Sequence, residues 1–155
     1  MLKLGGIYKN RNLTLYQLTS LEDKPGVAGA ILDYFAKNKI NLEYITESGT
    51  SDEKAVLAIC IAAGETKKFD DLIGSRNKMP ISFKIEKIEN VDIIGIYGPH
   101  FREKPAIAAT FLRLLGSAAI NVLGISTSVS SVCCVIPSNK LNLAEKAILK
   151  EYELP

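Results

Sequence analysis

"KPGVAGAILDYFAKNKINLEYITES", residues 24–48, decides the fold, because residues 104–128 repeat it as "KPAIAATFLRLLGSAAINVLGISTS". The two stretches align without gaps at an offset of 80 residues and share eight residues of 25, where average composition predicts about one or two. The identical pairs are Lys24/Lys104, Pro25/Pro105, Ala28/Ala108, Leu32/Leu112, Ile40/Ile120, Asn41/Asn121, Ile45/Ile125 and Ser48/Ser128. An internal repeat of this kind predicts two units with the same structure.

Each unit has the same predicted order of elements. Short runs rich in strand formers alternate with stretches whose apolar residues recur at helical spacing. Pro25 and Pro105 suit a first helical position, where the missing N–H of proline costs nothing. The order β-α-β-β-α-β is that of the split ferredoxin-like unit, so we predict an α+β fold with antiparallel sheets. Predicted strands cover residues 12–18, 40–48, 55–63, 81–88, 91–97, 120–127 and 130–136, and predicted helices begin at Pro25, Thr66, Pro105 and about Asn142.

The second unit lacks a fourth strand of its own, because only "EYELP" follows its last predicted helix. The N-terminal run "LKLGGIYK", residues 2–9, is a predicted strand that the first unit does not need. We therefore expect residues 1–9 to complete the sheet of the second unit. The first unit, residues 10–89, is then inserted within the second unit, residues 90–155.

Composition narrows the range of functions. The 19 basic and 17 acidic residues give a net charge of +2, and no basic stripe suggests nucleic acid as a partner. No apolar run reaches the length of a membrane helix and the N-terminus lacks a signal-peptide core, so we expect a cytoplasmic protein with no membrane partner. Cys60, Cys133 and Cys134 lie in apolar strand-like runs with unsuitable spacing for zinc, which favours buried, reduced thiols over a metal site.

The repeated stretch resembles the ACT domain, a small amino-acid-sensing module. The resemblance rests on the pattern acidic-x-Pro-Gly-Val-Ala, an amphipathic helix, and Ile-Asn-hydrophobic-x-x-Ile, which "EDKPGVAGAILDYFAKNKINLEYI" matches. The second copy, with its helix, Ile-Asn and "ISTS" in that order, is similar to the second ACT domain of aspartokinases. "GGIYKNRNLTLYQL" and "AEKAILKEYEL" resemble the two ends of an aspartokinase regulatory region, so the resemblance covers essentially the whole chain.

The resemblance implies a regulatory part without a kinase domain. The chain has no Walker-type glycine loop and no kinase signature, and the Gly5-Gly6 pair favours a strand bulge over a phosphate site. We expect a non-catalytic protein without a cofactor or metal. Its partners by resemblance are a free amino acid of the aspartate family, such as lysine or threonine, a second copy in a homodimer, and an aspartokinase catalytic subunit.

The loop into the first helix suits the polar end of a free amino acid. Unpaired N–H groups at a helix N-terminus attract a carboxylate, Gly26 permits close approach, and an acid at Asp23 or Glu103 can take the ammonium group. Asn41 and Asn121 offer amides that both donate and accept. The resemblance implies an effector pocket between two ACT units lying side by side. The predicted ligand-binding residues are Asp23, Pro25, Gly26, Val27, Ala28, Asn41, Leu42, Glu43, Glu47, Ala106, Ile107, Asn121, Val122, Ser126, Thr127 and Ser128.

Each of these features also has a purely structural interpretation. Pro25-Gly26 can simply begin a helix, Asp23 and Glu103 can compensate its dipole, and Asn41 and Asn121 can satisfy a tight turn. His100, the single histidine, is more typical of a solvated loop.

Several positions depart from the family pattern, among them Glu47-Ser48, where many aspartokinases carry Gln-Asn. Lys39 and Ala119 replace the usual glycine before Ile-Asn, so that turn either keeps its left-handed residue at a cost of about 1–2 kcal/mol or is rebuilt. Ala106 crowds the second helix start, and Val129 stands where an acid is common. These departures favour the first unit as the binding unit.

Three other functions remain open from the residues alone. The departures from the pattern also fit a purely structural dimerisation module with a degenerate pocket. An enzyme on the same fold is disfavoured, because no nucleophile–base pair is evident. A nucleic-acid reader would expose aromatic and basic residues on its central strands, and "AVLAICI" and "SSVCCVI" have neither.

Overall fold

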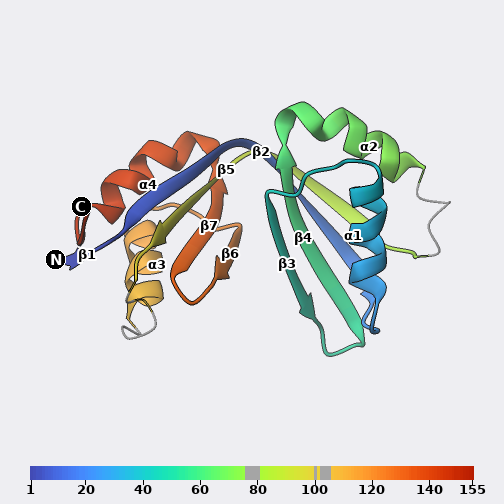
Figure 1. Cartoon of the computed structure of the whole chain (residues 1–155), viewed down its shortest axis with the longest axis horizontal. Coiled ribbons are helices and arrows are strands. Elements are labelled where there is room, and N and C mark those ends of the chain that lie inside the picture. The colour runs from blue at the N-terminus through green and yellow to red at the C-terminus, as the bar shows by residue number, and fades with distance from the viewer. Residues whose placement is uncertain (76–80, 100, 102–105) are drawn as a thin grey trace. The chain divides into compact units, whose positions relative to one another are not determined.

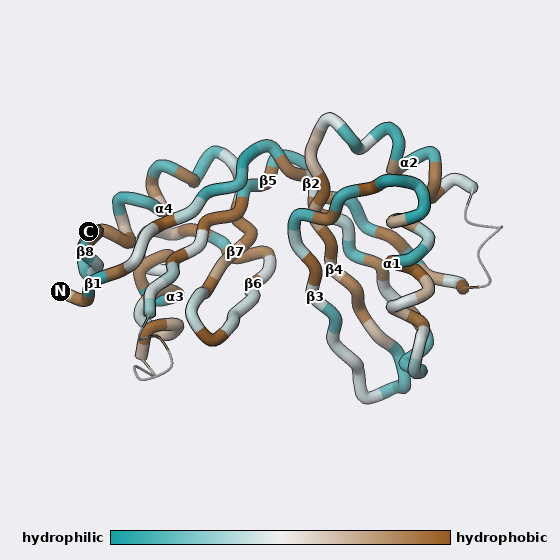
Figure 2. Tube along the Cα trace, viewed as in Figure 1, coloured by the Kyte–Doolittle hydropathy of each residue, from teal (hydrophilic) through white to brown (hydrophobic). Residues whose placement is uncertain are grey.

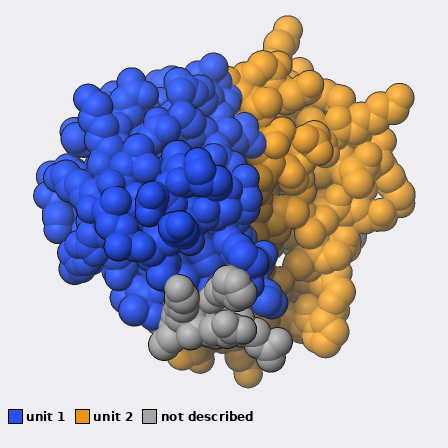
Figure 3. Space-filling model, turned by 60° about the vertical axis from the view of Figure 1, so that its left-hand side comes forward, with its two compact units in different colours: residues 1–12, 90–155 blue, residues 13–89 orange. Residues whose placement is uncertain are grey.

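The computed structural model describes residues 1–75, 81–99, 101 and 106–155. The chain divides into two compact units, shown in different colours in Figure 3. One unit, here the central unit, is Leu13–Glu89, and the other, the terminal unit, combines Met1–Asn12 with Asn90–Pro155. Neighbouring strands of the main sheet follow the order β3-β4-β2-β5-β7-β6. Strands β2 (Gly6–Glu22) and β5 (Lys84–Tyr97) each contribute residues to both units.

The central unit has the predicted ferredoxin-like order. After β2 come α1 (Val27–Lys37), β3 (Tyr44–Gly49), β4 (Lys54–Ala62), a short 3-10 helix η1 (Ala63–Glu65), α2 (Thr66–Gly74) and the first part of β5. Strand β4 pairs antiparallel with both β2 and β3. Figure 1 shows α1 and α2 on the same face of this sheet.

The central core is an aromatic and aliphatic cluster between that face and the two helices. Phe69 of α2 is fully buried, with its ring centroid 4.3 Å from that of Tyr16 on β2 and 4.8 Å from that of Phe35 on α1. Phe83, just before β5, is also buried in this cluster. Aromatic rings at these separations add to the stability gained from area burial alone. Alternate residues of β4 complete the cluster, and Figure 2 shows the hydrophobic character of this strand.

The terminal unit repeats the arrangement. After β5 come α3 (Ile107–Ser117), β6 (Gly124–Thr127), β7 (Ser131–Pro137), a short 3-10 helix η4 (Ser138–Lys140) and α4 (Leu141–Ile148). Strand β7 pairs antiparallel with β5 and β6. Its core joins Phe111, Leu114 and Leu115 of α3 to Ile94 and Ile96 of β5, with residues of β7 and α4.

The N-terminal strand completes the second unit, as the sequence predicts. The first residues of β2 lie in the terminal unit beside β5. "EYELP" adds no strand to this sheet, although Tyr152–Glu153 forms the short strand β8, which pairs parallel with β1 (Leu2–Lys3) in a separate two-stranded sheet. Tyr152 is buried and donates a hydrogen bond from its hydroxyl to the carbonyl of Ile107 (2.9 Å), and this contact holds the segment against α3.

The two long strands each cross from one unit to the other at a left-handed asparagine. Asn12 in β2 has φ 59° and Asn90 in β5 has φ 57°, a conformation that asparagine tolerates better than most residues. The backbone N–H of Asn12 donates to the buried Asp92 carboxylate (2.9 Å), which also accepts from the Ser138 hydroxyl (2.7 Å). The local sequence pattern predicts two shorter strands in place of each of these, because such crossings interrupt the apolar alternation.

Cys60 and Cys134 are buried and all three cysteines are free, whereas Cys133 is half-buried. The expectation of burial is wrong for Cys133, because adjacent residues of a strand face opposite sides of the sheet. Among the described residues, no helix is long and apolar enough to cross a membrane.

Lys39 and Ala119 keep the left-handed turn that follows each first helix. Their φ angles are 60° and 57°, so the turn is not rebuilt around them. The turn is closed by backbone hydrogen bonds from Ile40 to Phe35 (3.0 Å) and from Ile120 to Leu115 (3.0 Å). A side chain in this conformation costs about 1–2 kcal/mol relative to the right-handed one.

Ala119→Gly is therefore expected to stabilise the terminal unit by about 1 kcal/mol, because glycine adopts positive φ without strain. The matched control is Ala118→Gly one residue earlier, where φ is −88° and glycine is expected to destabilise. Denaturant unfolding of both variants measures the difference. Equal destabilisation by the two substitutions would contradict a strained turn.

A charged cluster lies beside the central core. Asp70 on α2 accepts hydrogen bonds from the Tyr16 hydroxyl (2.7 Å) and the Lys87 ammonium (2.7 Å). Burial by itself raises the pKa of Asp70, but the hydrogen bonds from Lys87 and Tyr16 outweigh it and hold this pKa below its usual value. The hydrogen bond to Asp70 also raises the pKa of Lys87.

We expect acid to weaken the central unit through this cluster. Because the folded-state pKa of Asp70 is depressed, its contribution is complete above the unfolded value of about 4 and is lost as the pH falls through the folded value. Asp70→Asn should flatten the dependence of unfolding free energy on pH below about pH 4. Asp71→Asn, at the next residue, is the control. If the unfolding free energy of Asp70→Asn falls below about pH 4 as steeply as that of the unmodified protein, Asp70 is not the source of the acid sensitivity.

Candidate functional site

The predicted binding loop of the central unit is a tight turn leading into α1. The backbone N–H of Val27 donates to the carbonyl of Lys24 (3.3 Å), and Gly26 has φ 89° and ψ −10°. These are the features of a type II turn, with proline at its second position and glycine at its third. The prediction that Pro25 begins the helix is wrong: α1 begins at Val27, and Pro25 instead fixes the preceding turn.

The N-terminus of α1 is open to a ligand. Among the described residues no side chain caps it, and its first turn carries no acid. The amides of Ala28 and Gly29 are first-turn groups without an intrahelical acceptor, and they sit at the positive end of the helix dipole. A Cβ built on Gly26 would meet no atom within 4 Å, so the space above this glycine is free. The end of the helix is thus suited to a carboxylate.

Acidic side chains gather at the same end of the central unit, where β3 ends. A Cβ at Gly49 would lie only 2.7 Å from an oxygen of Asp23, so the Asp23 carboxylate packs over this glycine. The Asp23 N–H donates to the carbonyl of Glu53 (3.0 Å), which ties the loop to the β3–β4 turn. Glu47 lies two residues before Gly49 and is exposed. Asp23 lies three residues before Gly26, so its carboxylate belongs to the loop that enters α1.

The other predicted residues of the central unit lie at the opposite end of α1. Asn41, Leu42 and Glu43 follow its C-terminus, and an 11-residue helix is about 16 Å long (Figure 1). The Asn41 amide donates to the Glu43 carboxylate (3.0 Å), and both residues are exposed. Leu42 packs against the core instead. A single amino acid is too small to contact both ends of one helix.

The terminal unit presents a different version of the loop. Ala106 precedes α3 with φ −80° and ψ −6°, a right-handed conformation open to any residue. Ile107, a predicted ligand contact, is a buried core residue, and Val122 also packs against the core. Ser126, Thr127 and Ser128 lie at the end of β6, where the Ser128 hydroxyl contacts that of Ser131 (2.8 Å). Asn121 is exposed after α3, at the far end of that helix.

The predicted residues thus form two groups within each unit, at opposite ends of the first helix. His100, Glu103 and Pro105 lie outside the described residues. Within the described ranges, no three His, Cys, Asp or Glu side chains gather as a metal site would require. Gly49 was missed by sequence reasoning, because nothing in its local sequence signals that a distant carboxylate packs over it.

Both units match a known protein family. One family model described as ACT domain matches residues 16–80, and another described as ACT domain matches residues 94–152. An aspartokinase from Helicobacter pylori is 23% identical over 154 residues, which cover 97% of this chain and 37% of that protein. The chain therefore spans little more than a third of the length of this curated relative.

Solved structures share the fold over nearly the whole chain. The ligand-free regulatory subunit of aspartate kinase from Thermus thermophilus superimposes with a TM-score of 0.84 at 17% identity, covering 97% of this chain and 99% of that one. Escherichia coli aspartokinase III in complex with lysine and aspartate gives a TM-score of 0.72 at 20% identity. That match covers 97% of this chain and 33% of the enzyme.

Proposed function

Because the chain belongs to the ACT domain family, with two ACT domains in tandem as in aspartokinase regulatory regions, we propose that it is a non-catalytic regulatory module that binds a free amino acid. The observation that carries the proposal is the uncapped N-terminus of α1 behind the left-handed Gly26. The α-carboxylate of the ligand lies against the first-turn amides of α1, and its ammonium group lies near Asp23.

The charge around this loop favours lysine among the aspartate-family amino acids, with threonine as the second candidate. Asp23 and Glu47 provide two carboxylates for the two ammonium groups of lysine. One structural relative, aspartokinase III of Escherichia coli, is described in complex with lysine. The terminal unit has Ala106 in place of the glycine and no acid at Val129, so the central unit is the binding unit.

The positions of Gly26 and Asn41 at opposite ends of α1 favour a paired assembly. Two copies related by a two-fold axis, with their α1 helices antiparallel, place the Gly26 loop of one copy beside Asn41 of the other. A ligand in that seam contacts both copies, so binding stabilises one arrangement of the pair over others. Such a difference in affinity is what allosteric coupling requires, typically about 1–3 kcal/mol.

The partner that receives the signal is an aspartokinase catalytic subunit or domain, in the cytoplasm. This assignment is supported by the coverage of the relatives. The chain corresponds to the whole of the Thermus thermophilus regulatory subunit but to only a third of aspartokinase III from Escherichia coli. The alternative is a dimerisation module with a degenerate pocket, which the departures at Lys39, Ala106 and Val129 favour.

Calorimetric titration with lysine, threonine and methionine tests the proposal. We expect saturable binding of lysine, and a ligand at about 100 times its Kd should raise the unfolding free energy by about 2.7 kcal/mol. Asp23→Asn should weaken binding about tenfold through loss of a charge-assisted contact to the ammonium. Asp33→Asn, which removes an acid that pairs with Lys37 on the exposed face of α1, is the matched control.

Extending the titration to all twenty amino acids separates the two alternatives. A dimer that binds none of the twenty amino acids, and whose partner enzyme is unaffected by Asn41→Ala, establishes the dimerisation module instead. Equal losses in Asp23→Asn and Asp33→Asn would show that general charge, rather than the Asp23 carboxylate, governs binding.

A further inference from the structure

The β3–β4 hairpin of the central unit is longer than its counterpart in the terminal unit. Strands β3 and β4 have six and nine residues, whereas β6 and β7 have four and seven. The two ladders begin at equivalent places in the repeat and share their first four residue pairs. The central ladder then continues by two more pairs, Ser48 with Val56 and Gly49 with Ala55. Residues 48–56, here called the hairpin extension, take the place of the short loop 128–130 of the terminal unit.

The hairpin extension contacts the loop that enters α1 through Asp23. The N–H of Asp23 donates to the carbonyl of Glu53 (3.0 Å). A Cβ built on Gly49 would lie 2.7 Å from a carboxylate oxygen of Asp23, closer than a Cβ atom approaches other heavy atoms in folded proteins. The carboxylate therefore occupies the space that any other side chain at position 49 would fill. Both contacts come from the hairpin extension, and the terminal ladder ends before it reaches this point, at Thr127 with Val132.

The backbone on both sides of this contact is held in place. Ser20, at the register shift of β2 against β4, has φ 59°, and Glu53 has φ 61°. Beyond the shift, Glu22 pairs with Lys54, and the N–H of Thr50 donates to the carbonyl of Lys54 (2.7 Å). Irregular strands and left-handed residues re-aim the chain, and they persist only where the surrounding contacts hold them. The segment that carries Asp23 is thus positioned by the hairpin as well as by its own sequence.

We propose that the hairpin extension positions the Asp23 carboxylate for the ligand, with Gly49 as the positioning residue. This inference rests on the proposed function, which assigns the ammonium group of the amino acid to Asp23. Asp23 is exposed, and an exposed side chain loses rotamer freedom when it binds a ligand. Packing over Gly49 selects the side-chain position of Asp23 before the ligand arrives, so binding costs less entropy. The device is particular to the central unit, since the terminal hairpin lacks the extension.

Gly49→Ala is expected to displace the Asp23 carboxylate and to weaken lysine binding about tenfold, as Asp23→Asn does. The variant should unfold at an unchanged or slightly higher temperature, because Gly49 does not have a positive φ and the atom that must move ends an exposed side chain. Gly64→Ala is the matched control: Gly64 is an exposed glycine of the same unit with no atom within 4 Å of a built Cβ. Calorimetric titration with lysine and thermal unfolding measure the two effects.

Two further measurements separate positioning from a merely structural role. Without ligand, the carboxyl ¹³C resonance of Asp23 should shift in Gly49→Ala and stay in place in Gly64→Ala. In the Asp23→Ala background, Gly49→Ala should cause no further loss of lysine affinity, because the group that it displaces is absent. A resonance that stays in place in Gly49→Ala, or the same tenfold loss in both backgrounds, overturns the inference.

The outcomes also distinguish this inference from the proposed function. If the unmodified protein binds no amino acid, both are overturned. If it binds lysine and Gly49→Ala binds lysine equally well, the proposed function stands and the positioning role is overturned. A loss in Gly49→Ala that is absent from Gly64→Ala and from the Asp23→Ala background establishes Gly49 as the residue that positions the carboxylate.

Discussion

Gly26→Ala is expected to weaken amino-acid binding at least tenfold and to destabilise the central unit by about 1–2 kcal/mol. At φ 89° and ψ −10°, this residue lies where an L side chain is strained. Alanine lowers this strain only by leaving the left-handed region, which converts the type II turn to type I. That conversion turns over the Pro25–Gly26 peptide and so changes the shape of the loop in front of the first-turn amides of α1. Ala106 at the start of α3 already has a right-handed conformation, with φ −80°.

Gly29→Ala provides the matched control. Gly29 lies inside α1, is exposed, and has no atom within 4 Å of a built Cβ. Alanine there should stabilise the helix by up to about 1 kcal/mol and leave binding unchanged. Calorimetry for binding and denaturant unfolding for stability give the two quantities separately. If Gly26→Ala keeps full affinity for lysine, the turn at Gly26 is not part of the binding site.

Phe69→Ala is expected to have the largest effect on stability, a loss of about 3–5 kcal/mol from the central unit. The Phe69 ring is fully buried between Tyr16 and Phe35, so its removal leaves a cavity that the sheet and α1 cannot close. A loss of that size is comparable to the entire stability of a small domain. It should accelerate amide hydrogen exchange across Leu13–Glu89 by about two to nearly four orders of magnitude.

The control for this prediction is Tyr34→Ala on the same helix as Phe35. Tyr34 is only half-buried and meets Phe35 at 6.0 Å between ring centroids, at the margin of the cluster. Its removal should cost well under half as much as that of Phe69. If the two substitutions cost the same, the cluster around Phe69 is not the principal core of the unit. Comparison of exchange in the two units shows whether they unfold separately.

Much of the fold could be predicted from local patterns. The helical spacing of Ile31 and Phe35 and the alternation around Phe83 and Ile85 place those residues toward the central core, where the structure has them. The strand starts were less accurate, because β3 begins at Tyr44 and β6 at Gly124 although their apolar runs begin about four residues earlier. Ile40 and Ile120 are buried, but they belong to the left-handed turns rather than to the strands.

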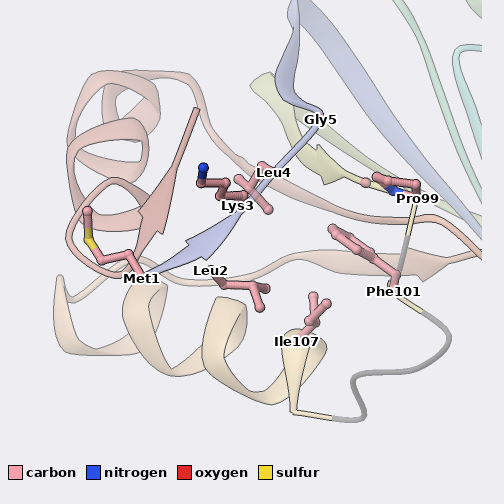
Figure 4. A pocket seen from close by; sticks show the side chains of 9 residues that line it. Met1, Leu2, Lys3, Leu4, Gly5, Pro99, Phe101 and Ile107 are labelled. Carbon is pink, nitrogen blue, oxygen red and sulfur yellow. The ribbon is translucent and has the colours of Figure 1, made fainter. Parts of the chain in front are cut away.

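The candidate site was only partly predictable. The sequence placed Gly26 at the entrance to a helix, and the structure adds its left-handed conformation and the open space above it. The contact between the Asp23 carboxylate and Gly49 joins residues that are 26 positions apart in the sequence. The lining of the apolar pocket shown in Figure 4 likewise brings Leu4 together with Phe101 and Ile107. Periodicity and turn chemistry act over a few residues, so they carry no information about such contacts.

By itself, the sequence determined the duplication, the order of elements, the faces of the helices and the absence of a kinase signature, because these follow from spacing and composition along the chain. The tertiary structure alone decided that β2 and β5 serve both units, that β8 pairs with β1, and that the hairpin of β3 and β4 reaches Asp23. Those features depend on strand pairing and side-chain packing between segments that are distant in the sequence, and these contacts form only when the chain folds.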